Sequence, residues 1–426
     1  MKKTALLIIT LDTKAEEALF LKKVLKRQGL NVLIMDVGVY PSSSAVGDIT
    51  REEVVAAAGE EIERLIQTKD KGTAIKTMMI GATALTETLY RKGRVHGVLS
   101  IGGVQGTIIG TTAMKALPVG VPKLMLSTVA SGRRAFEAYV GTNDMTLMHS
   151  VVDFFGLNAI LKQVLSNAAG ALAGMVKLEK VPPGKKQKVA ITIYGTTTPA
   201  GRLIVSLLEK AGYEVVAFHP NGTGGMAMER MIREGDFSGI IDLTTHELAD
   251  ELAGGDHACG PHRMEAASDM KIPQIVVPGS IDYIVKGRFE TLTPSLKKRT
   301  TMMHNPEMTF VKTSVKEMAE LGRIIARKLN HSKGNTIVMI PMKGFSYPNY
   351  RGRPLYNPKG CHAFTEALRE QIKSSIPVQE LPHHINDEAF GREVLIEFKK
   401  LMEKNETQYK KSERRERCCS RERSLT

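Results

Sequence analysis

The first forty residues of the chain alternate between aliphatic runs and a segment with helical spacing. Residues 4–9 are almost continuously aliphatic, and residues 18–25 then carry apolar side chains at the three- and four-residue intervals of a helix. Gly29 ends this helix, and residues 31–35 form a second aliphatic run. A strand, a helix and a second strand within so short a span predict a right-handed crossover and therefore a parallel sheet.

The same alternation continues to about residue 180. Further aliphatic runs predict strands at residues 76–80, 97–101 and 123–126, and helical spacing predicts helices at residues 51–67, 82–92, 107–117 and 158–178. Residues 181–187, Val-Pro-Pro-Gly-Lys-Lys-Gln, then combine helix breakers with charge, which is typical of a domain boundary.

Beyond this segment the pattern starts again. A strand at 189–194, a helix at 201–211 and a strand at 214–218 repeat the opening unit, followed by strands at 239–243, 275–277 and 336–340 and a helix at 315–329. The predicted fold class is α/β, with two tandem Rossmann-like open parallel-sheet domains, residues 1–182 and 187–408, and a cleft between them. Residues 409–426 alternate charged side chains and Ser, which predicts a disordered basic tail.

Composition narrows the class of protein. Hydrophobic residues make up 42% and charged residues 24%, as in ordinary globular domains. Four Cys are too few for a disulfide framework, and no run approaches the roughly 18 apolar residues that span a bilayer, so we expect a cytoplasmic protein without membrane contact. The net charge of +14 suits an anionic ligand, whereas the absence of Trp and the 5% aromatic content argue against nucleic-acid binding.

Polar loops of the N-terminal half fall at strand ends, where ligands of parallel α/β sheets bind. Glycines there let the backbone approach phosphate oxygens, hydroxyls donate hydrogen bonds to them, and Lys14 neutralises charge. The alternative is structural, with glycines in tight turns and Ser or Thr capping helices. The residues expected to surround an anion are Asp12, Thr13, Lys14, Gly102, Gly103, Gly106, Thr107, Ser127, Thr128, Ser131 and Gly132.

Residues 141–144, Gly-Thr-Asn-Asp, add two further candidates. Asn143 is a candidate ribose contact, and either Asp12 or Asp144 would hold a Mg²⁺ that bridges phosphate oxygens. A turn followed by a capped helix is the structural alternative. No G-x-x-x-x-G-K-[ST] pattern occurs, which excludes a P-loop NTPase.

The C-terminal half contains a glycine motif and a group of histidines. Residues 222–227 match G-x-G-x-x-G/A, with Asp242 twenty residues after Gly222, which is the spacing of a dinucleotide fingerprint built on Gly222 and Gly224. His219, His246, His257 and His262 lie close in sequence, together with Asp256 and Cys259. A transition metal binds such ligands, and His257 or His262 could serve as a general acid or base, although loop histidines are ordinarily solvated.

Several of these segments together resemble uncharacterised protein family 0261, the microbial relatives of the ATP-binding inhibitory domain of the tomato mosaic virus resistance protein. The resemblance covers about residues 3–400 and implies two Rossmann-like subdomains, an ATP site at the N-terminal loops named above, and a homodimer. It implies no catalytic activity. The segments that carry it are residues 12–14, 100–107, 126–132, 141–153, 195–200, 219–229, 242–245, 260–263 and 304–306.

The sequence therefore favours an ATP-binding protein with Mg²⁺, with an unknown small-molecule or protein partner, and leaves hydrolysis open. Two alternatives stay open as well. One is an NAD(P)-dependent oxidoreductase that uses the loop at residues 222–227, and the other is a regulatory binding protein without catalysis.

Overall fold

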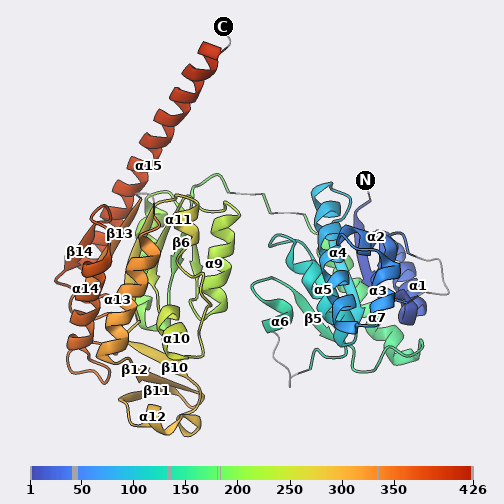
Figure 1. Cartoon of the computed structure of the whole chain (residues 1–426), viewed down its shortest axis with the longest axis horizontal. Coiled ribbons are helices and arrows are strands. Elements are labelled where there is room, and N and C mark those ends of the chain that lie inside the picture. Colours follow the sequence, from blue (N-terminus) through green and yellow to red (C-terminus); the bar gives the residue numbers. More distant parts are fainter. Residues whose placement is uncertain are drawn as a thin grey trace. The chain divides into compact units, whose positions relative to one another are not determined.

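The computed structural model describes residues 2–40, 47–131, 137–179, 181–182, 184–332 and 335–423, with the backbone alone for residues 137 and 408–423. The chain divides into two compact units, residues 1–182 and 183–426 (Figure 1). The division lies at the proline-rich segment where the sequence places a domain boundary. Each unit is described by itself.

The N-terminal unit is built on a five-stranded parallel sheet with the order β2-β1-β3-β4-β5. Neighbouring strands keep a continuous register, with Leu7 opposite Ile34 on one side and Leu99 on the other. The strands are β1 Thr4–Ile9, β2 Asn31–Asp36, β3 Gly97–Gly102, β4 Lys123–Ser127 and β5 Thr146–His149.

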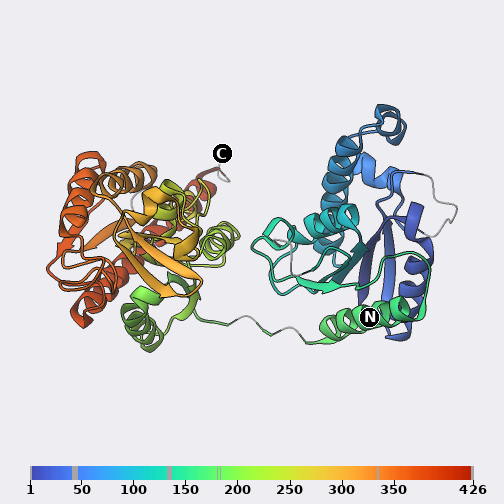
Figure 2. The same cartoon turned by 90° about the horizontal axis from the view of Figure 1, so that it is seen from below.

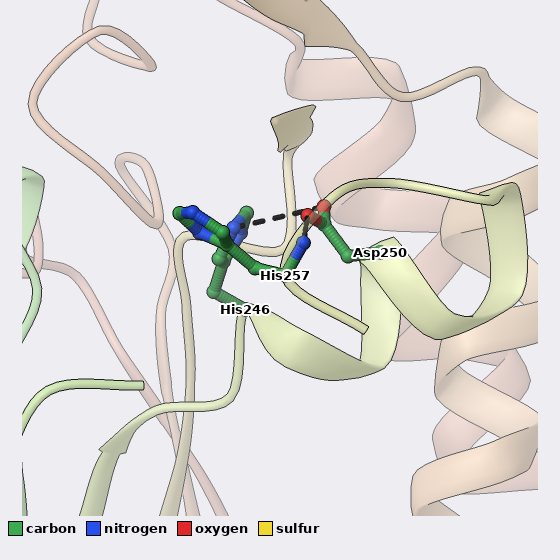
Figure 3. Close-up of side chains that lie close together, drawn as sticks. All are labelled: His246, Asp250 and His257. Atoms are coloured by element: carbon green, nitrogen blue, oxygen red, sulfur yellow. Dashed lines mark hydrogen bonds and ion pairs between the residues drawn. The ribbon is translucent and has the colours of Figure 1, made fainter. Parts of the chain in front are cut away.

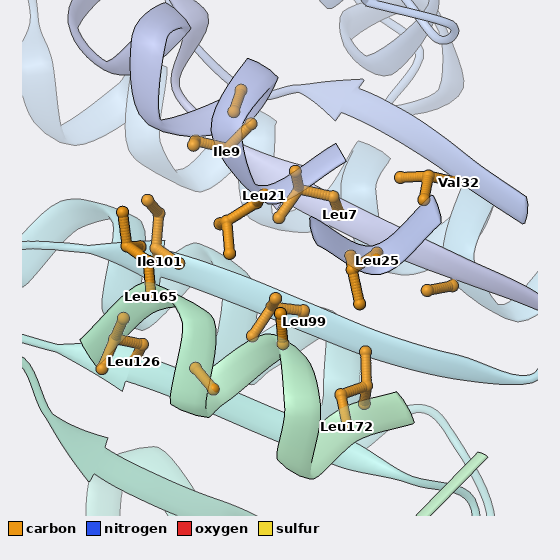
Figure 4. Packing of buried hydrophobic residues seen from close by; sticks show 14 of the residues in the cluster. Leu7, Ile9, Leu21, Leu25, Val32, Leu99, Ile101, Leu126, Leu165 and Leu172 are labelled. Carbon is orange, nitrogen blue, oxygen red and sulfur yellow. The ribbon is translucent and has the colours of Figure 1, made fainter. Parts of the chain in front are cut away.

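Helices cover both faces of this sheet, because its strands alternate apolar side chains toward each face. One face packs against α1 and α7, where Leu7, Leu21, Leu99 and Leu165 share a core (Figure 4). The other face packs against the remaining large helices, and Figure 2 shows α4 and α7 on opposite sides of the sheet. The helices are α1 Leu11–Arg27, α2 Arg51–Ala57, α3 Ile62–Thr68, α4 Lys71–Arg91, α5 Val104–Lys115, α6 Glu137–Val140 and α7 Ala159–Lys177.

Helix α7 has the length and apolar composition of a membrane span: it has 19 residues, and an 18-residue window within it has a mean hydropathy of 1.3. Its Leu161, Leu165, Leu172 and Val176 are buried in the core shared with α1 and the sheet. This packing is typical of a core helix.

Two predicted elements of this unit were wrong. Residues 76–80, predicted as a strand, lie inside α4, because Ala74, Met78 and Ala82 recur every four residues on the buried face of one helix. A short apolar run fits either element, and the Asp70 cap that begins the helix decides the outcome. The single helix predicted at 51–67 is two helices, separated at Gly59, whose φ of +81° ends the first.

The C-terminal unit contains a six-stranded parallel sheet with the order β14-β13-β9-β8-β6-β7. A three-stranded antiparallel sheet, β10-β12-β11, is inserted between β9 and β13 of the chain. The strands are β6 Lys188–Thr192, β7 Glu214–Phe218, β8 Gly239–Thr244, β9 Gln274–Gly279, β10 Tyr283–Lys286, β11 Thr301–Asn305, β12 Met308–Lys312, β13 Thr336–Pro341 and β14 Val378–Leu381.

Helices again cover both faces of the large sheet. Helices α8 and α15 share one core with it, and α10, α13 and α14 share another on the opposite face. The helices are α8 Thr198–Lys210, α9 Thr223–Arg233, α10 Glu247–Ala253, α11 Ala266–Asp269, α12 Pro294–Lys297, α13 Val315–Leu329, α14 Pro358–Gln371 and α15 Glu388–Arg423, with single turns η1 Gly195–Thr197 and η2 Phe289–Thr291.

Helix α15 continues to Arg423 and therefore includes most of the segment predicted as a disordered tail. Figure 1 shows its last turns extending away from the sheet of its own unit. Lys, Arg and Glu have high helix propensity, so a charged segment with few apolar residues can prolong a helix that begins in a packed core.

Candidate functional sites

The N-terminal unit has a pocket where the strand order reverses. The chain runs from β1 outward to β2 and then returns to β3 on the other side of β1, so the loops after β1 and β3 diverge at the carboxyl edge of the sheet. A pocket of about 880 Å³ lies there, within the size range of small-molecule sites. Its lining includes Asp12, Thr13 and Lys14 from the first loop and Gly103 and Gly106 from the second.

The loop after β1 is held by Asp36, the last residue of β2. Its Oδ1 accepts hydrogen bonds of 2.9 Å from the backbone N–H groups of Leu11 and Gly38. Burial raises the pKa of Asp36, although the two backbone hydrogen bonds oppose the shift. Asp36 therefore positions the start of α1, where Asp12 and Lys14 face the pocket.

Helix α5 begins at the pocket with its backbone donors unpaired. Gly103 is the N-cap residue, the first turn contains no acidic residue, and among the described residues no group accepts a hydrogen bond from the N–H groups of Val104, Gln105 or Gly106. Gly102 and Gly106 allow the strand and the helix to approach, since a Cβ on Gly102 would lie 2.8 Å from Gly106 Cα. An unpaired helix start of this kind binds anions.

Three lysines add positive charge to this pocket: Lys14, Lys69 and Lys71 all line it. The carboxylate of Asp70, between two of them, caps α4 by accepting hydrogen bonds from the N–H groups of Gly72 and Thr73 at 3.0 and 3.2 Å. The rest of the lining is largely apolar and includes Val37, Val39, Tyr40, Leu65, Ile66, Ala74, Ile75 and Ile109. The pocket therefore combines a cationic part with an apolar part.

Several residues predicted for the anion site lie elsewhere. Thr107 and Ser127 are buried and share a hydrogen bond of 2.6 Å that ties α5 to β4. Gly102, Thr128 and Ser131 are not in the pocket lining, although the backbone N–H of Thr128 donates to the carbonyl of Gly102. Gly132 lies outside the described residues.

Asp144 and Asn143 lie before β5, at the amino ends of the strands, whereas Asp12 follows the carboxyl end of β1. Asp144 pairs with Lys123, the first residue of β4, at 2.6 Å and also accepts a hydrogen bond from Gly120 N at 2.6 Å. Asn143 precedes it on the approach to β5. Both therefore lie at the amino ends of the strands and outside the lining of this pocket, whereas Asp12, the other candidate metal ligand, lies in it.

The predicted dinucleotide loop of the C-terminal unit is filled by a side chain of the protein itself. The Oε1 atom of Glu247 accepts hydrogen bonds from Gly222 N at 2.7 Å and Gly225 N at 3.0 Å. Gly222 has a φ of +93°, which an L-residue rarely adopts, so the loop requires glycine for its backbone. A pyrophosphate would have to displace a buried carboxylate.

Asp242, the acidic residue of the predicted dinucleotide fingerprint, is also engaged internally. It accepts two hydrogen bonds from Arg263, at 2.6 and 2.7 Å, and Arg263 donates a further bond of 2.7 Å to Glu247. Burial alone lowers the pKa of Arg263, but Asp242 and Glu247 outweigh it and hold the pKa well above its ordinary value. Because Arg263 and Asp242 are both buried, this geometry does not support the oxidoreductase alternative.

Two of the four histidines predicted as a group lie in a cluster with Asp250, and the other two are exposed. His246, Asp250 and His257 come together where the loops after β6 and β8 diverge, which is the strand-order reversal of this unit (Figure 3). His262 is 79% exposed and pairs with Glu265, so of the two predicted acid–base histidines only His257 belongs to the cluster. Cys259 is buried and is not one of the three side chains of this cluster.

Burial governs the charges in this cluster. It lowers the pKa of His246 to about 4 and raises the pKa of Asp250 to about 7. It also lowers the pKa of His257, with the nearby His246 adding to the shift. Tyr194 stacks on both His246 and His219, with ring centroids 5.0 and 4.9 Å away.

Some site residues escaped the sequence-based prediction. Asp36 is the last residue of the second strand, a position where Rossmann-like units often have a functional acidic residue, so this signal could have found it. Lys69 and Lys71 had no such signal, because they flank the N-cap of α4 and the pattern did not reveal the first part of that helix. Glu247 and Asp250 lie on α10, and nothing in their spacing indicates that they face a glycine loop and a histidine.

Known proteins match the chain over most of its length. Residues 3–181 and 186–402 match the N- and C-terminal domains of an uncharacterised protein family (UPF0261). A UPF0261 protein of Clostridium tetani is 41% identical over 95% of this chain and 100% of its own length. The ToMV resistance protein Tm-1(GCR237) of Solanum lycopersicum is 35% identical over 79% of this chain, which corresponds to 45% of the tomato protein.

Solved structures show only a remote likeness. The UDP-GlcNAc 2-epimerase of Methanocaldococcus jannaschii aligns at 9% identity with a TM-score of 0.22, over 64% of this chain and 83% of that chain. This similarity is too low to indicate a shared ligand.

Proposed function

The chain belongs to the uncharacterised protein family UPF0261, and we propose that its N-terminal unit binds ATP in the pocket between the loops after β1 and β3. The observation that carries the proposal is the unpaired start of α5, which opens into a pocket lined by three lysines. Backbone donors, a helix dipole and ammonium groups converge there, and phosphate groups carry the complementary charge and acceptors.

The apolar part of the pocket supports a nucleotide rather than a simple anion. Val39, Tyr40, Leu65 and Ile75 lie beside the cationic part within one pocket of about 880 Å³. A purine base is a flat apolar surface joined to a charged phosphate chain, so it needs both kinds of lining. Inorganic phosphate would leave the apolar part without a partner.

Asp12 is the residue that would hold Mg²⁺ with the nucleotide. Its carboxylate is partly exposed in the pocket, and its Oδ2 accepts one long hydrogen bond of 3.3 Å from Tyr40 N. Mg²⁺ is commonly held by one or two carboxylates together with phosphate oxygens and water. The carboxylate of Asp12 with the phosphates of a bound nucleotide would supply such ligands. The cytoplasmic location, the homodimer and the interdomain cleft stay predictions.

Titration calorimetry with ATP, with and without Mg²⁺, tests the proposal. Lys14→Ala should weaken ATP binding at least tenfold, because a charge-assisted contact contributes about 1.5–3 kcal/mol. Lys26→Ala is the matched control, since Lys26 is exposed in the last turn of the same helix. Equal affinity in the wild type and Lys14→Ala, or no saturable ATP binding by the wild type, would contradict the proposal.

A phosphate-release assay on the same samples then separates an enzyme from a regulatory protein. Saturable ATP binding without phosphate release would support the regulatory alternative.

A further inference from the structure

We propose that the C-terminal unit binds one divalent transition-metal ion through His246, Asp250 and His257. The three side chains come from two loops and one helix, and each offers a ligand atom within 4.8 Å of the others. Figure 3 shows the three side chains close together, with a dashed line that joins the ring of His246 to the carboxylate of Asp250. Two histidines and one carboxylate form a recurring ligand set for zinc and non-haem iron.

The ring of His246 has its free electron pair directed into the cluster. Its Nδ1 lies 2.9 Å from the carbonyl oxygen of Ser280, which can only accept a hydrogen bond, so Nδ1 carries the proton. The neutral ring then presents an unprotonated Nε2. That atom is fully buried and has no hydrogen-bond partner among the described residues. A buried acceptor without a donor is costly unless a ligand occupies its lone pair.

The separation between the first two ligand atoms fits a metal better than a shared proton. His246 Nε2 and Asp250 Oδ1 are 3.6 Å apart, which is beyond hydrogen-bond range. Two ligands at the usual distances from a tetrahedral zinc lie about 3.4 Å from each other. The ring of His257 is half-buried, and its ligand atom lies within 4.8 Å of those of His246 and Asp250.

The surrounding residues hold this geometry in place. Asp250 accepts backbone hydrogen bonds from Val285 at 3.0 Å and from His257 at 2.8 Å, so its carboxylate has a fixed orientation. Ser280, whose carbonyl orients His246, has a φ of +60°, which is a strained value for a residue other than glycine. Such outer contacts are typical of metal ligands, whose imidazoles donate their other N–H to a carbonyl or carboxylate.

The ligand count makes this a site of the catalytic type. Structural zinc sites use four protein ligands, whereas catalytic sites use three and leave a position for water. Among the rings of this group, His219 is exposed and His257 is half-buried. Tyr194 lies beside it, with its hydroxyl 3.3 Å from His257 Nδ1.

Cobalt titration of the full-length, tag-free chain after treatment with a chelator tests this inference. Visible Co²⁺ absorption bands should saturate at one ion per chain, and Zn²⁺ should displace them. His257→Ala should weaken Co²⁺ binding at least tenfold. His262→Ala is the matched control, because this histidine lies on the same loop yet pairs with Glu265 outside the cluster, and its affinity should stay within twofold of the wild type.

Thermal unfolding gives a second measurement that does not depend on one variant folding well. Added Zn²⁺ should raise the unfolding midpoint of the wild type and of His262→Ala, but not of His257→Ala or Asp250→Asn. Absence of saturable Co²⁺ binding by the wild type, or equal losses in His257→Ala and His262→Ala, would overturn the inference. ATP binding by the N-terminal unit should be the same in all four proteins, so either proposal can fail without the other.

Discussion

Two helices of this protein begin at glycine-rich loops on the carboxyl edge of a parallel sheet, and their surroundings differ. The start of α9 is closed, because Glu247 accepts the N–H groups of Gly222 and Gly225 and is itself paired with Arg263. The start of α5 is open to a pocket lined by lysines. A glycine motif therefore indicates backbone N–H groups that can bind an anion. The rest of the fold decides whether that anion is a carboxylate of the protein or a bound ligand.

The same contrast extends to the two strand-order reversals. In the N-terminal unit this position gathers backbone donors and ammonium groups, which attract an anion. In the C-terminal unit it gathers two imidazoles and a carboxylate, which attract a cation. Both follow one rule of open α/β sheets, that diverging loops leave room for a ligand, but the side chains give the two sites opposite chemistry.

Removing the guanidinium that supports the closed start should have the largest effect. Arg263→Met leaves the buried carboxylates of Asp242 and Glu247 without their cation and removes one of the two arginines that pair with Glu229. We expect a loss of about 3–5 kcal/mol in the free energy of unfolding. Urea denaturation measures this loss. Arg392→Met, which removes an exposed arginine paired with Glu388, is the control and should unfold like the wild type. Similar midpoints for both variants would show that Arg263 does not hold this loop.

Closing the open start should abolish the difference between the two helices. Gly103→Asp places a carboxylate at the N-cap of α5, where it would accept the free N–H groups and repel phosphate. We expect ATP affinity to fall more than tenfold, as measured by calorimetry, while the unfolding midpoint is unchanged or raised. A Cβ at this position would lie 3.7 Å from Thr128 Oγ1, which is an ordinary van der Waals contact, so the substitution fits. Gly103→Asn, of the same shape but uncharged, should bind ATP more tightly than Gly103→Asp; the reverse order would contradict an anion site.

The smallest effect should come from a hydroxyl that lies behind the open start. Ser127→Ala removes the buried hydrogen bond to Thr107, and we expect a loss of about 1 kcal/mol in the free energy of unfolding with ATP affinity within twofold of the wild type. Chemical denaturation and calorimetry on one preparation measure both quantities. A large loss of ATP affinity at unchanged stability would show that Ser127 contacts the ligand and would contradict this prediction.

Much of the architecture could be predicted from hydrophobic periodicity. The strands at residues 4–9, 97–101 and 239–243 occur with shifts of one residue at most, because a buried parallel strand leaves a short aliphatic run between polar loops. The strand predicted at 76–80 was wrong for the same reason, since a buried helix presents a similar run. The segment predicted as a disordered tail is instead largely helical, because helix propensity prolongs α15 without any apolar pattern.

The sites were predicted less completely than the fold. Asp12, Thr13, Lys14, Gly103 and Gly106 do line one pocket, because loops at the ends of neighbouring parallel strands must meet at one edge. Thr107, in the first turn of α5, and Ser127, the last residue of β4, are buried instead, and sequence spacing does not reveal that direction.

The sequence by itself determined the two α/β units, the chain order of most strands and the loops that carry polar chemistry, because these depend on local periodicity and on turn residues. Tertiary structure alone decided which carboxylates meet which donors. Glu247 fills the glycine loop at 222–225, Asp242 pairs with Arg263, and Asp250 faces His246, although nothing in their spacing distinguishes these roles. The physical reason is that burial and pairing depend on contacts between segments distant in sequence, and local periodicity carries no information about them.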